Sequence, residues 1–138
     1  MNRPIKFRAW VDEKMITDFL IKSTGQAEIY SVCTNVSLCG AQDCGMQTER
    51  RIDKKFVMQY TGLLDKRGKE IYEGDIASVN YEGEKETYEI KWFGEEEYPA
   101  FDFKNWDGDS NGLSEAIQGS HIEIEVVGNI YENKDLLK

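Results

Sequence analysis

One short segment of the sequence carries side chains suited to binding a cation. Residues 107–112 read DGDSNG, with oxygen-bearing side chains at alternate positions and a glycine at the sixth, as in the first half of a calcium-binding loop. The second half departs from that pattern, because the twelfth position is Gln118 and not a bidentate glutamate. Asp107, Asp109 and Asn111 are therefore candidates for a weak calcium site, and a turn that ends in a helix cap explains the same residues.

A second candidate site is a basic run within residues 49–55. Its four cationic side chains could bind phosphate, which makes the run the best nucleic-acid candidate in the chain: Arg50, Arg51, Lys54 and Lys55. Two acids lie among them, and short basic runs are common on surfaces, so a solvated lead into the next strand is the alternative.

The cysteines and the lone histidine do not form a metal or catalytic pattern. Cys33, Cys39 and Cys44 lack C-x-x-C spacing, and His121 is distant in sequence. An odd number of cysteines fits free thiols in a reducing compartment. No G-x-S-x-G, phosphate-loop, H-E-x-x-H or dinucleotide motif occurs, so we expect no catalytic residue and no cofactor.

Charge is divided unevenly along the 138 residues. Residues 1–72 have a net charge of +3 and residues 73–138 a net charge of −12. The overall charge of −9 disfavours nonspecific binding to nucleic acid, while halves of opposite sign permit a head-to-tail contact between copies. No apolar run is long enough to span a bilayer, and the start of the sequence lacks a signal peptide, so we expect a cytoplasmic protein without a membrane partner.

Alternating apolar and polar residues predict short strands along most of the chain. We expect a hairpin over residues 4–22, a strand over 27–33, a loop over 34–47, and a second hairpin that pairs 77–81 with 88–92. Further strands are predicted within 98–106 and 122–131, with a bulge at Gly128, and a helix over 111–118.

This pattern predicts one mainly β domain over residues 1–138, a small barrel or sandwich of short antiparallel strands with at most one or two short helices. Residues 56–131 would form the barrel-like core, 1–55 an N-terminal extension that contains a β-hairpin, and 132–138 a short tail.

The most informative stretch is MQYTGLLDKRGKEIYEGDI at residues 58–76. Asp65 to Gly68 has the composition of a tight turn, because aspartate accepts hydrogen bonds from the backbone ahead of it and glycine adopts the left-handed conformation readily. The stretch resembles the signature of the YopX family of small phage and prophage proteins, and IKFRAWVDEKMI at 5–16 and EVVGNIYENKDLL at 125–137 match as well.

The resemblance implies a mostly β fold, a phage origin, and neither an established activity nor catalytic residues. The resemblance also implies that six residues of the matching blocks have a structural role in turns: Gly62, Gly68, Gly74, Asp75, Gly128 and Asn129.

We therefore expect a non-catalytic phage or prophage accessory protein that acts as a self-associating interaction module. Its partners would be further copies of itself, as a homo-oligomer, and an unidentified host or phage protein. Three tryptophans and seven tyrosines support this reading, because interfaces favour such side chains. Two alternatives stay open: a nucleic-acid-binding module that uses the basic N-terminal half, and an acidic decoy that mimics nucleic acid and occupies a host protein.

Overall fold

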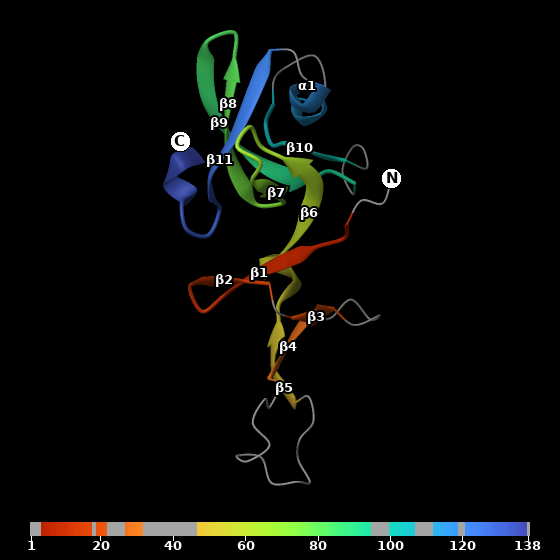
Figure 1. The fold of residues 1–138 in the computed structure, drawn as a ribbon. Coiled ribbons are helices and arrows are strands. Elements are labelled where there is room, and N and C mark those ends of the chain that lie inside the picture. The colour runs from red at the N-terminus through yellow and green to blue at the C-terminus, as the bar shows by residue number, and fades with distance from the viewer. Residues whose placement is uncertain are drawn as a thin grey trace. The chain divides into compact units, whose positions relative to one another are not determined.

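The structure is a computed structural model that describes residues 4–17, 19–21, 27–31, 47–94, 100–106, 112–118 and 121–137 (Figure 1). Side chains are described for all of these except residues 20, 27–31, 47–50 and 118. The chain forms two compact units, one of residues 7–58 and the other of residues 1–6 with 59–138. Compactness does not make either unit a domain, so the single-domain organisation and its boundaries at 55 and 131 stay predictions.

The smaller unit, residues 7–58, consists of short antiparallel strands and one helical turn. Its elements are β1 (Phe7–Val11), β2 (Lys14–Ile16), β3 (Leu20–Ile21), β4 (Ala27–Ser31), β5 (Gln47–Ile52) and the 3-10 helix η1 (Lys54–Phe56). Strands β1 and β2 form a hairpin, and a separate three-stranded sheet has the order β3-β4-β5. Ala9 and Ile52 are buried at the centre of this unit.

One sequence prediction for this unit differs from the structure. The predicted hairpin of residues 4–22 is divided, because β2 ends at Ile16 and β3 pairs with β4 instead. The first part of the basic run is strand β5, and the cations of the run whose side chains are described, Arg51, Lys54 and Lys55, are exposed. The register places Arg51 directly opposite Glu28 of β4, and opposite charges at such a position favour pairing. Alternation along one segment does not reveal the distant segment with which it pairs.

The larger unit contains the remaining strands and helices. They are β6 (Val57–Leu64), which begins in the smaller unit, β7 (Glu70–Tyr72), β8 (Asp75–Tyr81), β9 (Glu84–Trp92), β10 (Phe101–Phe103), α1 (Gly112–Gln118), β11 (Ile122–Asn129) and η2 (Lys134–Leu137). An antiparallel sheet has the order β10-β9-β8-β11, and β7 pairs with β6. The helix near 111–118 is present, whereas the hairpin is tighter than predicted, because residues 77–81 pair with 84–88 across a two-residue turn.

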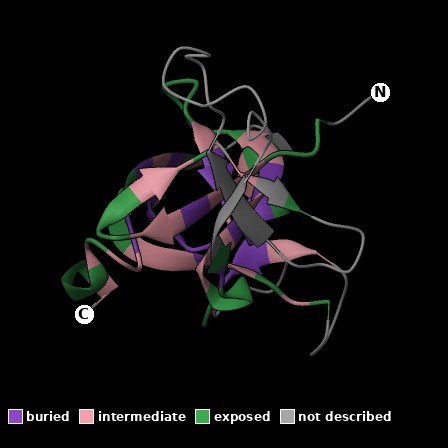
Figure 2. Ribbon diagram, turned by 90° about the horizontal axis from the view of Figure 1, so that it is seen from below, coloured by how far each residue is buried: buried purple, intermediate pink, exposed green. Residues whose placement is uncertain are grey.

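The core of the larger unit lies on one face of this sheet. It is formed by apolar side chains from five strands and α1: Ile71, Ala77, Val79, Ile90, Phe103, Leu113, Ile124 and Val126. Figure 2 shows buried residues gathered on the strands, while η2 is mostly exposed. The register of β11 on β8 shifts between Val126 and Gly128, so the bulge predicted at Gly128 is present. The fold is mainly β with very little helix, and the predicted fold class is confirmed.

Candidate functional site

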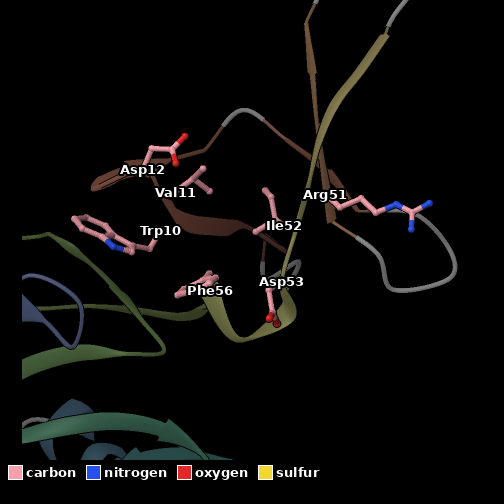
Figure 3. A pocket seen from close by; sticks show the side chains of 7 residues that line it. All are labelled: Trp10, Val11, Asp12, Arg51, Ile52, Asp53 and Phe56. Atoms are coloured by element: carbon pink, nitrogen blue, oxygen red, sulfur yellow. The ribbon is translucent and has the colours of Figure 1, made fainter.

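A pocket of about 340 Å³ lies in the smaller unit and is a candidate binding site (Figure 3). Its lining comes from β1, the turn after it, the end of β5 and η1: Trp10, Val11, Asp12, Arg51, Ile52, Asp53 and Phe56. Apolar side chains form most of the wall and three charged side chains stand around it, which is the usual composition of a pocket that binds a specific ligand.

Two local structures position these side chains. Asp12 and Glu13 form the two-residue turn between β1 and β2, and both have positive φ angles, of 50° and 61°. Such a turn matches the twist of a hairpin but is unfavourable for residues other than glycine, asparagine and aspartate. At the other side, Asp53 begins η1, because its carboxylate accepts the backbone N–H of Lys55 at 3.1 Å. The backbone N–H of Phe56 donates to the carbonyl of Asp53 at 2.9 Å, and this bond holds Phe56 in place.

The charges around the pocket are mixed. The backbone N–H of Lys55 is the main cause that lowers the pKa of Asp53, and the Lys55 ammonium, 3.4 Å from the carboxylate, acts in the same direction. Asp53 is therefore ionised and already neutralised by a neighbour at neutral pH. Arg51 and Asp12 are both exposed, and Figure 3 shows the guanidinium of Arg51 directed away from Trp10 and Phe56.

The residues of the basic run occupy different positions relative to the pocket. Arg51 lines the pocket, and Lys54 and Lys55 lie exposed on η1 beside it. Arg50 lies opposite Ile29 in the register of β5, and its side chain is outside the described part. The run therefore contributes one cation to the pocket wall and two nearby.

Two further cations of the basic half are paired within the larger unit. Lys66 lies 3.5 Å from Glu123 and 3.3 Å from Glu125, and Arg67 lies 2.7 Å from Glu125. Glu125 is the first cause that raises the pKa of Lys66. Glu123 and Glu125 of β11 neutralise the charges of Lys66 and Arg67, so the turn that carries these two cations is a poor binding site for phosphate.

The residues considered for metal binding cannot be compared with the structure. Asp107, Asp109, Asn111 and the three cysteines lie outside the described residues. Within the described ranges, no group of three or more histidine, cysteine or acidic side chains is placed to hold a metal ion. His121 is exposed just before β11. Among the helices that the structure describes, none has the length and apolar character to cross a membrane.

Two buried aspartates fix turns and ends of strands. Asp75, 1% exposed, accepts the backbone N–H of Tyr72 at 2.8 Å across a turn that contains Gly74 with a φ of 79°. Asp102, also 1% exposed, accepts the N–H groups of Phe103 and Leu113 at 2.8 and 2.9 Å, which ties β10 to the start of α1. Both carboxylates bind backbone N–H groups and neither is aimed at a described pocket.

Asp65 is the third buried aspartate, and it joins two distant segments. Its Oδ1 accepts the N–H groups of Arg67 and Lys69, and its Oδ2 accepts that of Val126. Burial opposes ionisation, but these three hydrogen bonds outweigh it and lower the pKa of Asp65. The predicted turn at residues 65–68 is thus also a clamp on β11.

Asn129, another residue of the signature, caps the turn after β11. Its side-chain oxygen accepts the N–H groups of Tyr131 and Glu132, both at 3.0 Å. Next to it, a Cβ on Gly128 would lie 2.4 Å from the side-chain oxygen of Asn133, so glycine is required there while Asn133 keeps its position. In the described structure, Gly128 and Asn129 shape the end of the strand.

The sequence analysis counted Trp10 among the tryptophans that favour an interface, but it did not place Trp10 beside Phe56. Trp10 has the same parity as Lys6 and Arg8 and therefore shares their polar face, and a tryptophan on a polar face is a signal of binding that could have been used. Phe56 follows Trp10 by 46 positions, and nothing local connects them.

The family model described as "YopX protein" matches residues 6–138 of the chain. The chain belongs to the YopX family. The resemblance seen in the three sequence blocks is thereby confirmed, and YopX proteins share the fold as well. The crystal structure of yopX from Bacillus subtilis is similar with a TM-score of 0.63 and 21% identity, covering 96% of this chain and 98% of that one.

A second YopX-like fold is found in protein EF1440 from Enterococcus faecalis. It is similar with a TM-score of 0.60 and 23% identity, covering 99% of this chain and 100% of that one. At these identities the two likenesses establish the fold alone. No curated protein matches the sequence.

Proposed function

We propose that this YopX protein is a phage or prophage accessory protein that works in the cytoplasm of the bacterial host as a protein-interaction module. In this proposal, the pocket of the smaller unit receives a side chain of a partner protein. The observation that carries it is the apolar wall of the pocket, to which Trp10, Ile52 and Phe56 contribute. Tryptophan, tyrosine and arginine are the residues most enriched among those that dominate the binding energy at interfaces.

The dimensions of the pocket support this kind of ligand. About 340 Å³ is near the lower limit of ligand pockets, which span about 300–1,000 Å³, and suits one large side chain. Apolar contacts with Ile52 and Val11 would provide affinity, while the charged groups would select the orientation. The described groups around the pocket have no nucleophile–base pair of the kind that covalent catalysis requires.

The test is capture of partners by a tagged protein from host lysate, with wild type compared with Arg51→Glu. Arg51 is exposed and lies opposite Glu28 of β4, so thermal melts of wild type and variant first establish that the unit is still folded. Lys134→Glu is a matched control, because it reverses another exposed cation on η2. We expect a protein that wild type and Lys134→Glu capture and that Arg51→Glu loses, with affinity lowered at least tenfold. Equal capture by Arg51→Glu would refute the proposal.

A nucleic-acid-binding function is the second candidate. Lys54 and Lys55 lie beside the pocket, and Lys55 lies 4.9 Å from the centre of the Phe56 ring. Aromatic rings with neighbouring cations bind single-stranded nucleic acid by stacking and by contacts with phosphate. Nuclease treatment of half of each lysate separates the two functions. A captured signal that disappears with nuclease would support this candidate, whereas a protein that survives it supports the first.

A further inference from the structure

We propose that the larger unit has an interaction surface of its own at one end of its sheet, and that this surface binds a positively charged segment of a partner protein. We name it the tip surface, and it consists of Tyr81, Glu82, Glu84, Glu86 and Ile122. These residues belong to the β8–β9 turn, the strand ends that flank it and the start of β11 (Figure 1). None of them lines the pocket of the smaller unit, so the inference goes beyond the proposed function.

The apolar face of the sheet continues into the tip surface and is left open there. Tyr81 of β8 lies directly opposite Glu84 of β9 and directly opposite Ile122 of β11. Residues opposite each other in an antiparallel pair share a face, so all three lie on the face that carries the core. Val79, two positions before Tyr81 on this face, is 2% exposed, whereas Tyr81 is 45% exposed. The core face of an inner strand thus ends in a large aromatic side chain that is half open to a partner.

The charged side chains of the tip surface are all acidic. Glu84 lies opposite Tyr81, and Glu86 is two positions farther along β9, so both share the core face, while Glu82 lies in the turn. All three glutamates are exposed. Glu86 accepts the hydroxyl of Tyr88. The carboxylates of Glu82 and Glu84 have no ion-pair partner in the described part of the chain, so they are available to a cation.

Acids on the opposite face of the same sheet are neutralised by lysines. Lys104 lies 3.0 Å from Glu89, and Lys66 lies 3.5 Å from Glu123 and 3.3 Å from Glu125. The alternation of side chains along β9 also places both cations of the four strands on that opposite face: Lys85 and Lys91. The strands therefore put no cation on the core face, and the acids of the tip surface depend on a partner for neutralisation.

The charge and the aromatic ring together define the kind of partner. Nucleic acid, an anionic membrane and an acidic protein surface are all repelled by carboxylates. A protein segment with lysine or arginine on both sides of an apolar side chain fits, because the apolar side chain packs on the Tyr81 ring while the cations meet Glu82 and Glu84. An aromatic centre with a charged rim is also the common anatomy of protein interfaces.

The β8–β9 turn holds this surface in a fixed form. Glu82 and Gly83 have φ angles of 50° and 91°, and two residues with positive φ make the type I′ turn that suits a tight hairpin. Tyr81 and Glu84 on either side of the turn are the last pair of the register. A ring and a carboxylate on paired strand ends lose little conformational entropy on binding.

The experiment follows the amide NMR signals of the labelled protein during titration with short acetylated peptides. One peptide alternates lysine with leucine, the second has serine in place of each leucine, and the third has glutamate in place of each lysine. We expect the lysine–leucine peptide to shift the signals of residues 81–86 and 122. The lysine–serine peptide should bind at least tenfold more weakly, and the glutamate–leucine peptide should leave these signals unchanged. Binding should weaken as salt rises, because exposed charge pairs contribute to it.

Two variants test the residues that carry the inference. Tyr81→Ala removes the ring and Glu84→Lys reverses an exposed acid, and each should weaken binding of the lysine–leucine peptide at least tenfold. Matched controls are Leu136→Ala and Asp135→Lys, at exposed residues of η2. Helix η2 lies on the opposite face of the sheet, where the Leu136 carbonyl accepts the hydroxyl of Thr87, so both controls should bind as wild type does. Thermal melts establish that every variant is folded.

Several outcomes would overturn the inference. These are a wild-type protein that does not bind the lysine–leucine peptide, equal binding of the lysine–serine peptide, and variants Tyr81→Ala and Glu84→Lys that bind normally. Tip signals that shift with protein concentration before any peptide is added would identify a second copy as the occupant instead. Arg51→Glu should bind the peptide as wild type does, so failure of this inference leaves the test of the pocket unaffected, and the reverse also holds.

Discussion

The side-chain Oδ2 of Asp65 accepts the backbone N–H of Val126 at 3.0 Å, across 61 positions of the sequence. In the same place, the N–H of Lys66 donates to the carbonyl of Ile124 at 3.0 Å. Strand β11 is the last strand of its sheet, and these bonds occupy backbone groups on its outer side. Unpaired strand edges invite aggregation, so the turn after β6 protects this edge.

Asp65→Asn should destabilise the protein, because the amide can still accept hydrogen bonds with its oxygen but presents a donor where the second oxygen was. Two donors would then face each other at Val126. We expect the free energy of unfolding to fall by about 1–3 kcal/mol at pH 7, measured by urea denaturation. Asp135→Asn, at an exposed aspartate, is the control and should change little.

The effect of Asp65→Asn should depend on pH in a defined direction. The folded-state pKa of Asp65 lies below its ordinary value of 3.8, so its contribution to stability is fully present above pH 3.8. It is lost as the pH falls through the lower, folded-state pKa. If the difference in unfolding free energy between Asp65→Asn and wild type already disappeared between pH 7 and pH 5, the lowered pKa of Asp65 would not be its cause.

Glu73 should have the opposite effect on stability. Burial is the main cause that raises its pKa above the ordinary 4.5, and Glu89 acts in the same direction. The folded protein therefore holds the proton more tightly, and the cost of ionisation appears as the pH rises from 4.5 through the raised value. Glu73→Gln should melt at a higher temperature than wild type at pH 7 and at the same temperature below pH 4.5. Glu84→Gln, at an exposed glutamate, should show no such crossover.

Gly128→Ala should destabilise the bulge in β11. The new methyl group would meet the side chain of Asn133, so that side chain must move, at a cost of about 1–3 kcal/mol. Asn133→Ala alone loses only an acceptor 3.4 Å from the Asn129 N–H. The double variant should recover only part of the loss caused by Gly128→Ala, because the Cβ of residue 133 remains and would lie 2.7 Å from the new methyl group; a double-mutant cycle measures this coupling. Additive losses would mean that another contact causes the strain.

Glu13→Gly should stabilise the protein by about 0.5–1 kcal/mol, because a left-handed backbone costs other residues about 1–2 kcal/mol and glycine loses part of that advantage to its freedom when unfolded. Glu13→Ala retains a Cβ and is the control. If alanine stabilised the protein as much as glycine, the φ of 61° at this residue would not be the cause. Thermal melting of the three proteins decides between these outcomes.

Local signals in the sequence predicted much of the larger unit. Alternation placed β8 and β9, and the composition of residues 65–68 predicted the turn there, because both depend on residues close in sequence. The bond of Asp65 to Val126 could not be predicted, since the sequence does not state which distant strand passes beside a turn.

The candidate site was predicted only in part. Arg51 was singled out for its charge, but as one of four cations on a solvated segment. The pocket exists because β1, β5 and η1 bring Trp10, Ile52 and Phe56 together, and this arrangement depends on tertiary packing between separate segments. Residue type alone identified a cation and not the apolar wall beside it.

Strand β8 is the inner strand between β9 and β11, and its two neighbours are synthesised at very different times. β9 follows after a turn of two residues, whereas Asn129 at the end of β11 is added 48 residues after Tyr81. At about 5–20 residues per second, a ribosome leaves the other side of β8 unpaired for roughly 2–10 s. During translation the nascent sheet therefore presents an open strand that other chains or a chaperone can reach, and that exposure ends only when β11 arrives.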